Sequence, residues 1–232
     1  MSPTLTVDDL MFEVLPSPNR KTVELTVERD GHLTIRAPAG TDDSVLTGFV
    51  QEKRFWLYQK IAMKNAMRQA VATKEFVSGE GFPYLGRSYR LLLVDHQDVS
   101  LKLETGRFRM NRGDAHKGRE LFIAWYALHA LPWIRNRVRL FAPRVGVEPA
   151  RVEVRDLGFR WGSCGRAGTL NFNWATILLP PAIVEYVIVH ELVHIHEANH
   201  TPEFWQRVER AMPDYERRKA WLAENGAGYV VL

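Results

Sequence analysis

Residues 187–200 of the chain read V-I-V-H-E-L-V-H-I-H-E-A-N-H and contain the pattern H-E-x-x-H. On a helix, residues four apart differ by about 40° around the axis, so His190 and His194 project from one face about one turn apart. That geometry suits two ligands of one metal ion. Glu191 lies about 100° from His190, off the ligand pair but within reach of a water that the metal activates. The pattern therefore predicts His190 and His194 as metal ligands and Glu191 as a general base.

A third ligand is expected from His200, which follows the second motif histidine by six positions. A straight helix would turn His200 away from the His190 face, so we expect the helix to end first. Asn199 tolerates a left-handed turn, and Thr-Pro-Glu at residues 201–203 is typical of the N-cap and first turn of a new helix. His200 would then lie at the corner, near the metal. Three neutral imidazoles and one water form a catalytic zinc set, so the predicted cofactor is Zn²⁺.

Two other side chains of this stretch are interpreted differently. His196 points about 200° away from His194, which favours a solvent-facing or hydrogen-bonded role over metal binding. Glu197 stands where the pattern H-E-x-x-H-x-x-G-x-x-H has glycine. A capping or supporting role is favoured for Glu197, and a carboxylate ligand is the alternative. A buried apolar helix whose histidines are satisfied in a core would explain the stretch without any metal, but the specificity of the motif disfavours it.

The composition is that of a globular protein, with 46% hydrophobic and 25% charged residues among 232. A net charge of +4 permits an anionic partner such as nucleic acid but supports it only weakly. Cys164 is the single cysteine, so no disulfide framework exists and a reducing, cytoplasmic location is expected. The first residues do not resemble a signal peptide, and no apolar run reaches the roughly 18 residues that predict a membrane span. The sequence leaves the oligomeric state open.

The order of these patterns predicts an α+β fold in two regions. Residues 1–114 are expected to be strand-rich with one helix, and residues 115–232 to hold a metallohydrolase region with a mixed sheet and the H-E-x-x-H helix. In the first region we expect strands at 11–15, 21–28 and 32–37, a hairpin turn at Asp30-Gly31, a helix over 41–61, and strands at 84–94 and 99–110, the latter a hairpin turning at Thr105-Gly106. In the second we expect a long helix over 119–141 that Pro132 kinks or ends, strands at 152–156 and 169–179, the motif helix after Pro180-Pro181, and two further helices.

With these residues in place, the C-terminal half resembles the YgjP-like family of zincin metallohydrolases, which are relatives of the SprT-like proteins. The resemblance implies a zincin-like, more narrowly gluzincin-like, core in which His190, His194 and His200 bind zinc and Glu191 activates water. Members are described as metal-dependent peptidases, and a competing description is a nucleoside triphosphate pyrophosphatase that acts on UTP. The matching stretches are residues 160–164, 170–174, 189–194, 199–200, 204–205 and 212–215, with weaker matches at residues 20–22 and 84–87.

The matching stretch R-W-G-S-C at residues 160–164 has two interpretations. In one, it is an ordinary turn in which Arg160 pairs on the surface. In the other, Arg160 faces the metal cleft and stabilises negative charge that develops on a carbonyl or phosphoryl oxygen. Cys164 is not expected to act as a nucleophile, because no residue pattern predicts a lowered pKa for its thiol.

Three functions remain open at this stage, with either a peptide or a nucleotide as substrate. The first is a zinc metallopeptidase whose substrate chain adds to the strand at residues 169–177. The second is a triphosphate pyrophosphatase, although no P-loop is present. The third is a SprT-like nucleic-acid-associated protease or pseudoenzyme. We rank the peptidase first. The phosphate-holding residues in the second hypothesis would be Arg160 with Arg20, Lys21, Arg87 or Arg90.

Overall fold

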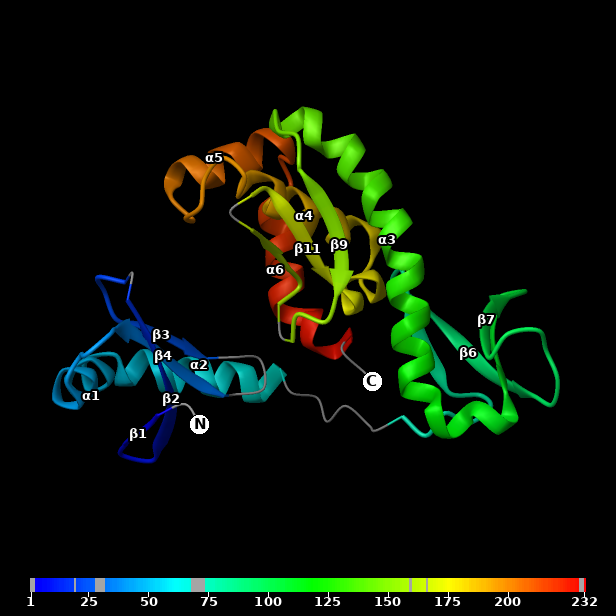
Figure 1. Cartoon of the computed structure of the whole chain (residues 1–232), viewed down its shortest axis with the longest axis horizontal. Helices are drawn as coiled ribbons and strands as arrows, with labels where there is room; N and C mark the ends of the chain where they lie inside the picture. Colours follow the sequence, from blue (N-terminus) through cyan, green and yellow to red (C-terminus); the bar gives the residue numbers. More distant parts are fainter. Residues whose placement is uncertain are drawn as a thin grey trace. The chain divides into compact units, whose positions relative to one another are not determined.

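The computed structural model describes residues 3–18, 20–27, 32–67, 74–158, 160–165, 167–229 and 232 (Figure 1). The fold is α+β, as expected, with mixed sheets and helices. The chain divides into two compact units, Met1–Gln69 and Ala70–Leu232. This division differs from the boundary that we expected at residue 114. The sequence pattern changes there, but the strands before it share a core with the helix after it: Phe82 stacks on Phe122 with ring centroids 3.9 Å apart.

The first unit holds a four-stranded sheet and two helices. The strand order is β1-β2-β4-β3, with β2 and β4 parallel. Phe12 and Ile35 are fully buried and form the core with residues of the helices. The expected helix over 41–61 is present but consists of two helices that meet at Lys53. The hairpin turn expected at Asp30-Gly31 lies outside the described residues. The elements are β1 (Thr4–Val7), β2 (Leu10–Ser17), β3 (Glu24–Val27), β4 (Leu33–Pro38), α1 (Asp43–Glu52) and α2 (Arg54–Met67).

The second unit begins with another four-stranded sheet, in the order β5-β6-β8-β7. The expected turn at Thr105-Gly106 is confirmed, with φ of 48° and 76°, the left-handed values that a two-residue hairpin turn requires. The single strand expected at 84–94 is instead a hairpin that turns at Leu85-Gly86. Glycine is needed there, because a Cβ at Gly86 would lie 2.8 Å from the Cα of Pro180, just ahead of the motif helix. The strands are β5 (Gly81–Tyr84), β6 (Arg87–Val94), β7 (Leu101–Glu104) and β8 (Arg107–Asn111).

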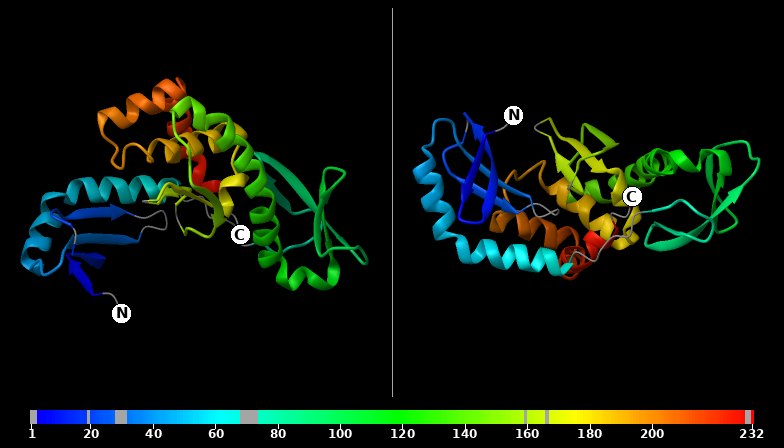
Figure 2. Two further views of the ribbon diagram at one scale, coloured as in Figure 1. Left: turned by 45° about the horizontal axis from the view of Figure 1, so that its top comes forward. Right: turned by 90° about the horizontal axis from the view of Figure 1, so that it is seen from below.

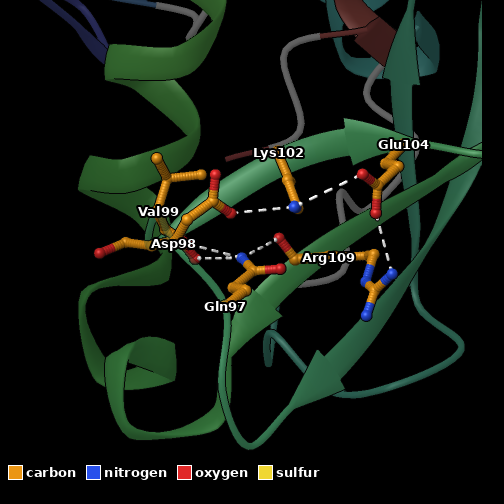
Figure 3. A network of polar contacts seen from close by, with 7 residues as sticks. Gln97, Asp98, Val99, Lys102, Glu104 and Arg109 are labelled. Atoms are coloured by element: carbon orange, nitrogen blue, oxygen red, sulfur yellow. Dashed lines mark hydrogen bonds and ion pairs between the residues drawn. The ribbon is translucent and has the colours of Figure 1, made fainter.

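Polar side chains fasten the connection between β6 and β7 to strand β8 (Figure 3). The side-chain amide of Gln97 donates hydrogen bonds to the carbonyl oxygens of Val99 at 2.7 Å and of Arg109 at 3.0 Å. Lys102 and Arg109 both pair with Glu104, at 3.5 Å and 2.9 Å. Exposed pairs of this kind contribute at most about 1 kcal/mol each. Their main effect is to place charge on the β7 edge, which discourages pairing with another chain.

The long helix α3 (Gly118–Val145) packs against both sheets of the second unit. Figure 2 shows it from two directions, between the sheet of β5 to β8 and the sheet that contains β9 and β11. We expected Pro132 to kink or end this helix, and it does not end there. Phe122, Ile134 and Phe141 bury one face along its whole length, and this packing outweighs the hydrogen bond that proline removes. A short 3-10 turn, η1 (Arg112–Lys117), precedes the helix.

The third sheet carries the motif helix. Its order is β10-β11-β9, with β11 parallel to β9 and antiparallel to β10. The strand expected at 169–179 ends at Asn173, because the Asn173 side chain accepts a hydrogen bond from the Ala175 N–H at 2.9 Å and starts a 3-10 turn. No helix in the described part of the chain has the length and apolar character needed to cross a bilayer. The elements are β9 (Arg151–Arg155), β10 (Gly162–Cys164), β11 (Thr169–Asn173), η2 (Trp174–Leu178), α4 (Pro181–Val193), α5 (Pro202–Ala211), α6 (Tyr215–Asn225) and η3 (Gly226–Tyr229).

Candidate metal centre

Helix α4 places two of the predicted ligands in its last turn. The helix is apolar on all sides, as expected of a helix that is covered all round, and begins with Pro181 at a position where its missing N–H is harmless. His190 lies in the last turn, and His194 is the C-cap residue with φ −62° and ψ −15°. These helical angles keep His194 one turn above His190 on the same face, as the spacing predicts.

The chain then turns earlier than expected. Helix α4 ends at Val193, where the N–H groups of His196 and Glu197 both bond to the Val193 carbonyl at 3.0 Å. Asn199 is not among the residues with positive φ, so the predicted left-handed turn at this residue is wrong. The start of the next helix is as predicted: the Thr201 hydroxyl accepts the Phe204 N–H at 3.3 Å, and Pro202 is the first residue of α5. His200 therefore lies at the corner between the two helices.

The three histidines converge on one point. The Nε2 atom of His190 lies 3.2 Å from Nε2 of His194 and 3.0 Å from Nε2 of His200. The candidate ligand atoms of all three lie within 4.8 Å of one another. Two nitrogens bound at about 2.0–2.1 Å to one tetrahedral ion are about 3.3–3.4 Å apart, which is close to both measured separations. The donor set therefore fits a divalent ion that prefers imidazole.

Neighbouring groups orient His194 and His200. Nδ1 of His194 lies 3.0 Å from the Glu197 carbonyl oxygen, a contact that places the ring proton on Nδ1 and leaves Nε2 free for a metal. The backbone carbonyl of Glu197 thus supports His194, while the role of the Glu197 side chain stays a prediction. The ring of Trp205 stacks on His200 with centroids 5.6 Å apart and an interplanar angle of 26°. Lys219 covers Trp205, with Nζ 3.7 Å from the ring centroid.

The surroundings of His190 and His200 favour the neutral imidazole, which is the form that binds metal. Burial lowers the pKa of His190 to about 3, helped by positive charge on His194, His200 and Lys219. Burial, His194 and Lys219 also lower the pKa of His200.

Glu191 is the most perturbed carboxyl group near the metal centre. Only 6% of the residue is exposed, and Oε2 has no hydrogen-bond partner among the described residues. Burial raises the pKa of Glu191 from an ordinary value of 4.5 to about 8, against the opposing charge of Arg160. Gly162 of strand β10 packs directly on this side chain, since a Cβ there would lie 2.7 Å from Cγ of Glu191. The absence of a side chain at Gly162 is therefore what makes room for the carboxyl group.

Arg160 and Cys164 flank this part of β10. Arg160 is exposed, and its guanidinium makes no hydrogen bond or ion pair within the described part of the chain. The positive charge of Arg160 nevertheless opposes the rise of the Glu191 pKa. The guanidinium is therefore close enough to interact electrostatically with the carboxyl group. Cys164 is half-buried, and burial followed by the charge of Glu191 raises the pKa of its thiol. A thiol held protonated in this way is a poor nucleophile, in line with the expectation from the sequence.

His196 points away from the three ligands. Its Nε2 lies 3.1 Å from the Gly146 carbonyl oxygen, at the end of α3. The hydrogen-bonded role predicted from its position is therefore confirmed.

Strands β10 and β9 form the two edges of the third sheet, and the edge that packs beside Glu191 of the motif helix belongs to β10 and not to the strand that we nominated. Strand β11, which begins the nominated segment 169–177, lies between β10 and β9 and has both edges paired. Trp161 accepts a hydrogen bond from Asn173 at 2.9 Å, and Gly165 donates one to Thr169 at 2.8 Å. In an antiparallel pair such bonds alternate, so the N–H and C=O groups of Gly162 point to the open side.

A cavity of about 170 Å³ lies beside the metal centre. Most of the residues that line it were not predicted from the sequence. Tyr186 could have been found, since it precedes His190 by four positions on the helix and its ring lies 6.0 Å from that of His190. No local pattern connects the others to the motif. The lining residues are Trp161, Gly162, Tyr186, Val187, His190, Glu191 and Leu222.

Comparisons with known proteins show to which family the chain belongs. The model of a family described as YgjP-like, metallopeptidase domain, matches residues 21–225. A solved structure, the crystal structure of the metallopeptidase zymogen of Pyrococcus abyssi abylysin, is 24% identical and covers 38% of this chain and 86% of that chain. Its TM-score of 0.35 is too low to transfer any residue or role. No curated protein matches the chain significantly. The family match spans most of the chain, including all three histidines and Glu191, and the chain therefore belongs to the YgjP-like family of metallopeptidase domains.

Proposed function

We propose that this protein is a zinc-dependent peptidase with His190, His194 and His200 as ligands and Glu191 as general base. The observation that carries the proposal is the convergence of three imidazole nitrogens beside a buried carboxyl group, at the open edge of a sheet. A nickel, copper or iron ion would also accept imidazole ligands, but three histidines with an open position favour zinc. The match to a metallopeptidase domain supports the same activity.

The ion would be held by the three histidines, and when bound it supplies Lewis acidity that polarises a carbonyl group and makes water acidic. Glu191 accepts a proton from the attacking water as the water oxygen bonds to the peptide carbonyl carbon. The same carboxyl group then delivers that proton to the amine nitrogen as the C–N bond breaks. Arg160 is suited to stabilise negative charge that develops on the former carbonyl oxygen. Its exposed guanidinium, without an ion pair in the described part of the chain, is free to turn toward a substrate.

The open edge of β10 supports an extended peptide as the substrate. Its outward N–H and C=O groups can pair with a substrate backbone whatever its sequence. Strand β10 also packs on α4, through the contact between Gly162 and Glu191. A chain added to this edge would therefore run past the carboxyl group.

No observation favours the pyrophosphatase alternative. A triphosphate needs several free cations around the reacting phosphorus. Arg20 is instead engaged with Glu24 at 2.6 Å, and Arg90 bonds to the Gly79 carbonyl at 3.2 Å. Nucleic-acid association would be revealed by DNA binding that falls steeply with salt.

The test is a side-by-side turnover assay of zinc-loaded protein on unfolded casein and on the four ribonucleoside triphosphates. Cleavage of casein is expected, with a loss of at least about 100-fold in Glu191→Gln and abolition by a chelator. The Glu191→Gln protein should still bind zinc, which separates loss of the base from loss of the site. Hydrolysis of a triphosphate without casein cleavage, equally dependent on Glu191, would overturn the peptidase proposal.

A further inference from the structure

We propose that the cavity beside Glu191 receives one large apolar side chain, the size of leucine or phenylalanine, from a residue next to the scissile bond. This inference rests on the proposed peptidase function and names its substrate class. It makes the protein selective for extended peptides with an apolar residue at that position.

The size and lining of the cavity fit such a side chain. Its volume of about 170 Å³ is close to that of a cavity of roughly 150 Å³ that holds benzene in another protein. Trp161, Tyr186 and Val187 form apolar walls, each less than a tenth exposed. The ionisable side chains in the lining are Tyr186, His190 and Glu191, and none of them is a fixed cation. A carboxylate or phosphate would lose its water beside the acidic Glu191 without gaining a fixed cation from the side chains of the lining, so an apolar group is favoured.

The register of β10 directs a substrate side chain into this cavity. Residues directly opposite each other on antiparallel strands place their side chains on the same face of the sheet. The Cβ direction of Gly162 points at Glu191, so this face is the one that carries the cavity. A substrate residue paired with Gly162 through its outward N–H and C=O groups would therefore project its side chain beside Glu191. Because Gly162 has no side chain, Glu191 can lie directly against the strand, and the substrate side chain would enter the cavity next to the carboxyl group.

Leu222 of α6 is the wall that can be changed with least harm to the core. It is only partly buried, whereas Trp161 and Val187 are buried. Leu222 and Trp161 meet across Gly226, where a Cβ would lie 3.0 Å from Leu222 Cδ1 and 3.2 Å from Trp161 Cζ2. Leu222 thus forms part of the cavity wall together with Trp161, and its size should set the volume of the cavity.

The experiment uses zinc-loaded full-length protein and fluorogenic peptides that differ only at the two positions flanking the scissile bond. Glycine, alanine, leucine, phenylalanine, glutamate and lysine are placed at each position in turn. At one of the two positions we expect kcat/KM for leucine or phenylalanine to exceed that for alanine by about ten- to a hundredfold, with glutamate and lysine lowest.

Variants of Leu222 then test the assignment of the cavity. Leu222→Trp should reduce the preference for leucine over alanine at least about tenfold while alanine peptides are still cleaved. Leu222→Ala should shift the preference toward phenylalanine. The matched control is Leu128→Ala on α3, a leucine that is 71% exposed and outside the cavity, and it should leave the profile unchanged.

The outcomes separate this inference from the proposed function. Efficient peptide cleavage with equal rates for apolar and charged residues at both positions would overturn the inference and leave the peptidase intact. An apolar preference that Leu222→Trp does not alter, in a variant with the wild-type circular dichroism spectrum, would place the selectivity elsewhere. Should the wild-type protein cleave no peptide while it binds zinc, the proposed function itself would fail. The wild-type preference profile needs no variant to fold.

Discussion

Glu191 should make the metal-free protein less stable as the pH rises, and replacing it by glutamine should remove this effect. In the folded protein burial raises the pKa of Glu191 from 4.5 to about 8, so the folded state holds the proton more tightly than the unfolded state. The stability contributed by this group is complete below pH 4.5 and is lost as the pH rises through about 8. Glutamine has nearly the same shape and no titrating proton, so the variant should not show this loss.

The size of the effect follows from the two pKa values. Each pKa unit corresponds to about 1.4 kcal/mol of free energy. At pH 7 the ionisation of Glu191 lowers the free energy of unfolding of the metal-free wild-type protein by on the order of 3 kcal/mol. Above pH 8 this loss approaches about 5 kcal/mol. His190 titrates in both proteins, so its own contribution cancels in the difference. Glu191→Gln should therefore match the wild type at pH 4.5 and exceed it increasingly at higher pH.

The assay is urea unfolding of both proteins between pH 4.5 and 8.5, followed by tryptophan fluorescence. All tryptophans except Trp56 lie in the unit that contains Glu191, so the signal reports mainly on that unit. Added zinc should shrink the difference, because a cation beside the carboxyl group favours its charged form. A stability difference that does not change with pH, or one that favours the wild type at high pH, would refute this reasoning.

Three further substitutions test the parts of the metal centre. Gly162→Ala places a Cβ 2.7 Å from Glu191 Cγ and should lower kcat/KM at least about 100-fold by displacing the base, with zinc affinity in a competition titration unchanged. Trp205→Ala removes the ring that stacks on His200 and should weaken zinc binding about tenfold in the same titration. An unchanged affinity would show that the stacking does not position His200. His196→Ala removes the contact with the Gly146 carbonyl and should lower the free energy of unfolding by about 1 kcal/mol without affecting zinc affinity. A large loss of zinc affinity would contradict the placement of His196 outside the ligand set.

The candidate metal ligands were predictable from the sequence because they depend on local geometry. Helical spacing alone places His190 and His194 on one face, and the Thr201 cap with Pro202 fixes where the next helix starts. The exact end of α4 was not predictable. Asn199 has the propensity for a left-handed turn, but the hydrogen bonds to the Val193 carbonyl turn the chain earlier. Local propensity at Asn199 was outweighed by contacts that already satisfy the helix end.

What the sequence did not reveal depends on contacts between distant segments. Gly162 is one of many glycines in the chain, and only the position of α4 beneath it shows that Glu191 occupies the space of its missing side chain. Leu222 lines the cavity although it lies about thirty positions after Glu191 in the sequence. The open edge of β10 follows from the order of the strands, which alternation of polar and apolar residues does not specify. The boundary at residue 70 escaped prediction for the same reason, since a shared aromatic core joins strands and a helix of different composition.

The most direct test of the account is the coordination of zinc in the purified protein, measured by metal analysis and X-ray absorption at the zinc edge. We predict one zinc ion per chain with three imidazole nitrogens at about 2.0–2.1 Å, and loss of one imidazole in His200→Ala. Zinc bound without imidazole ligands, or a coordination shell that is unchanged when His200 is replaced, would contradict the account.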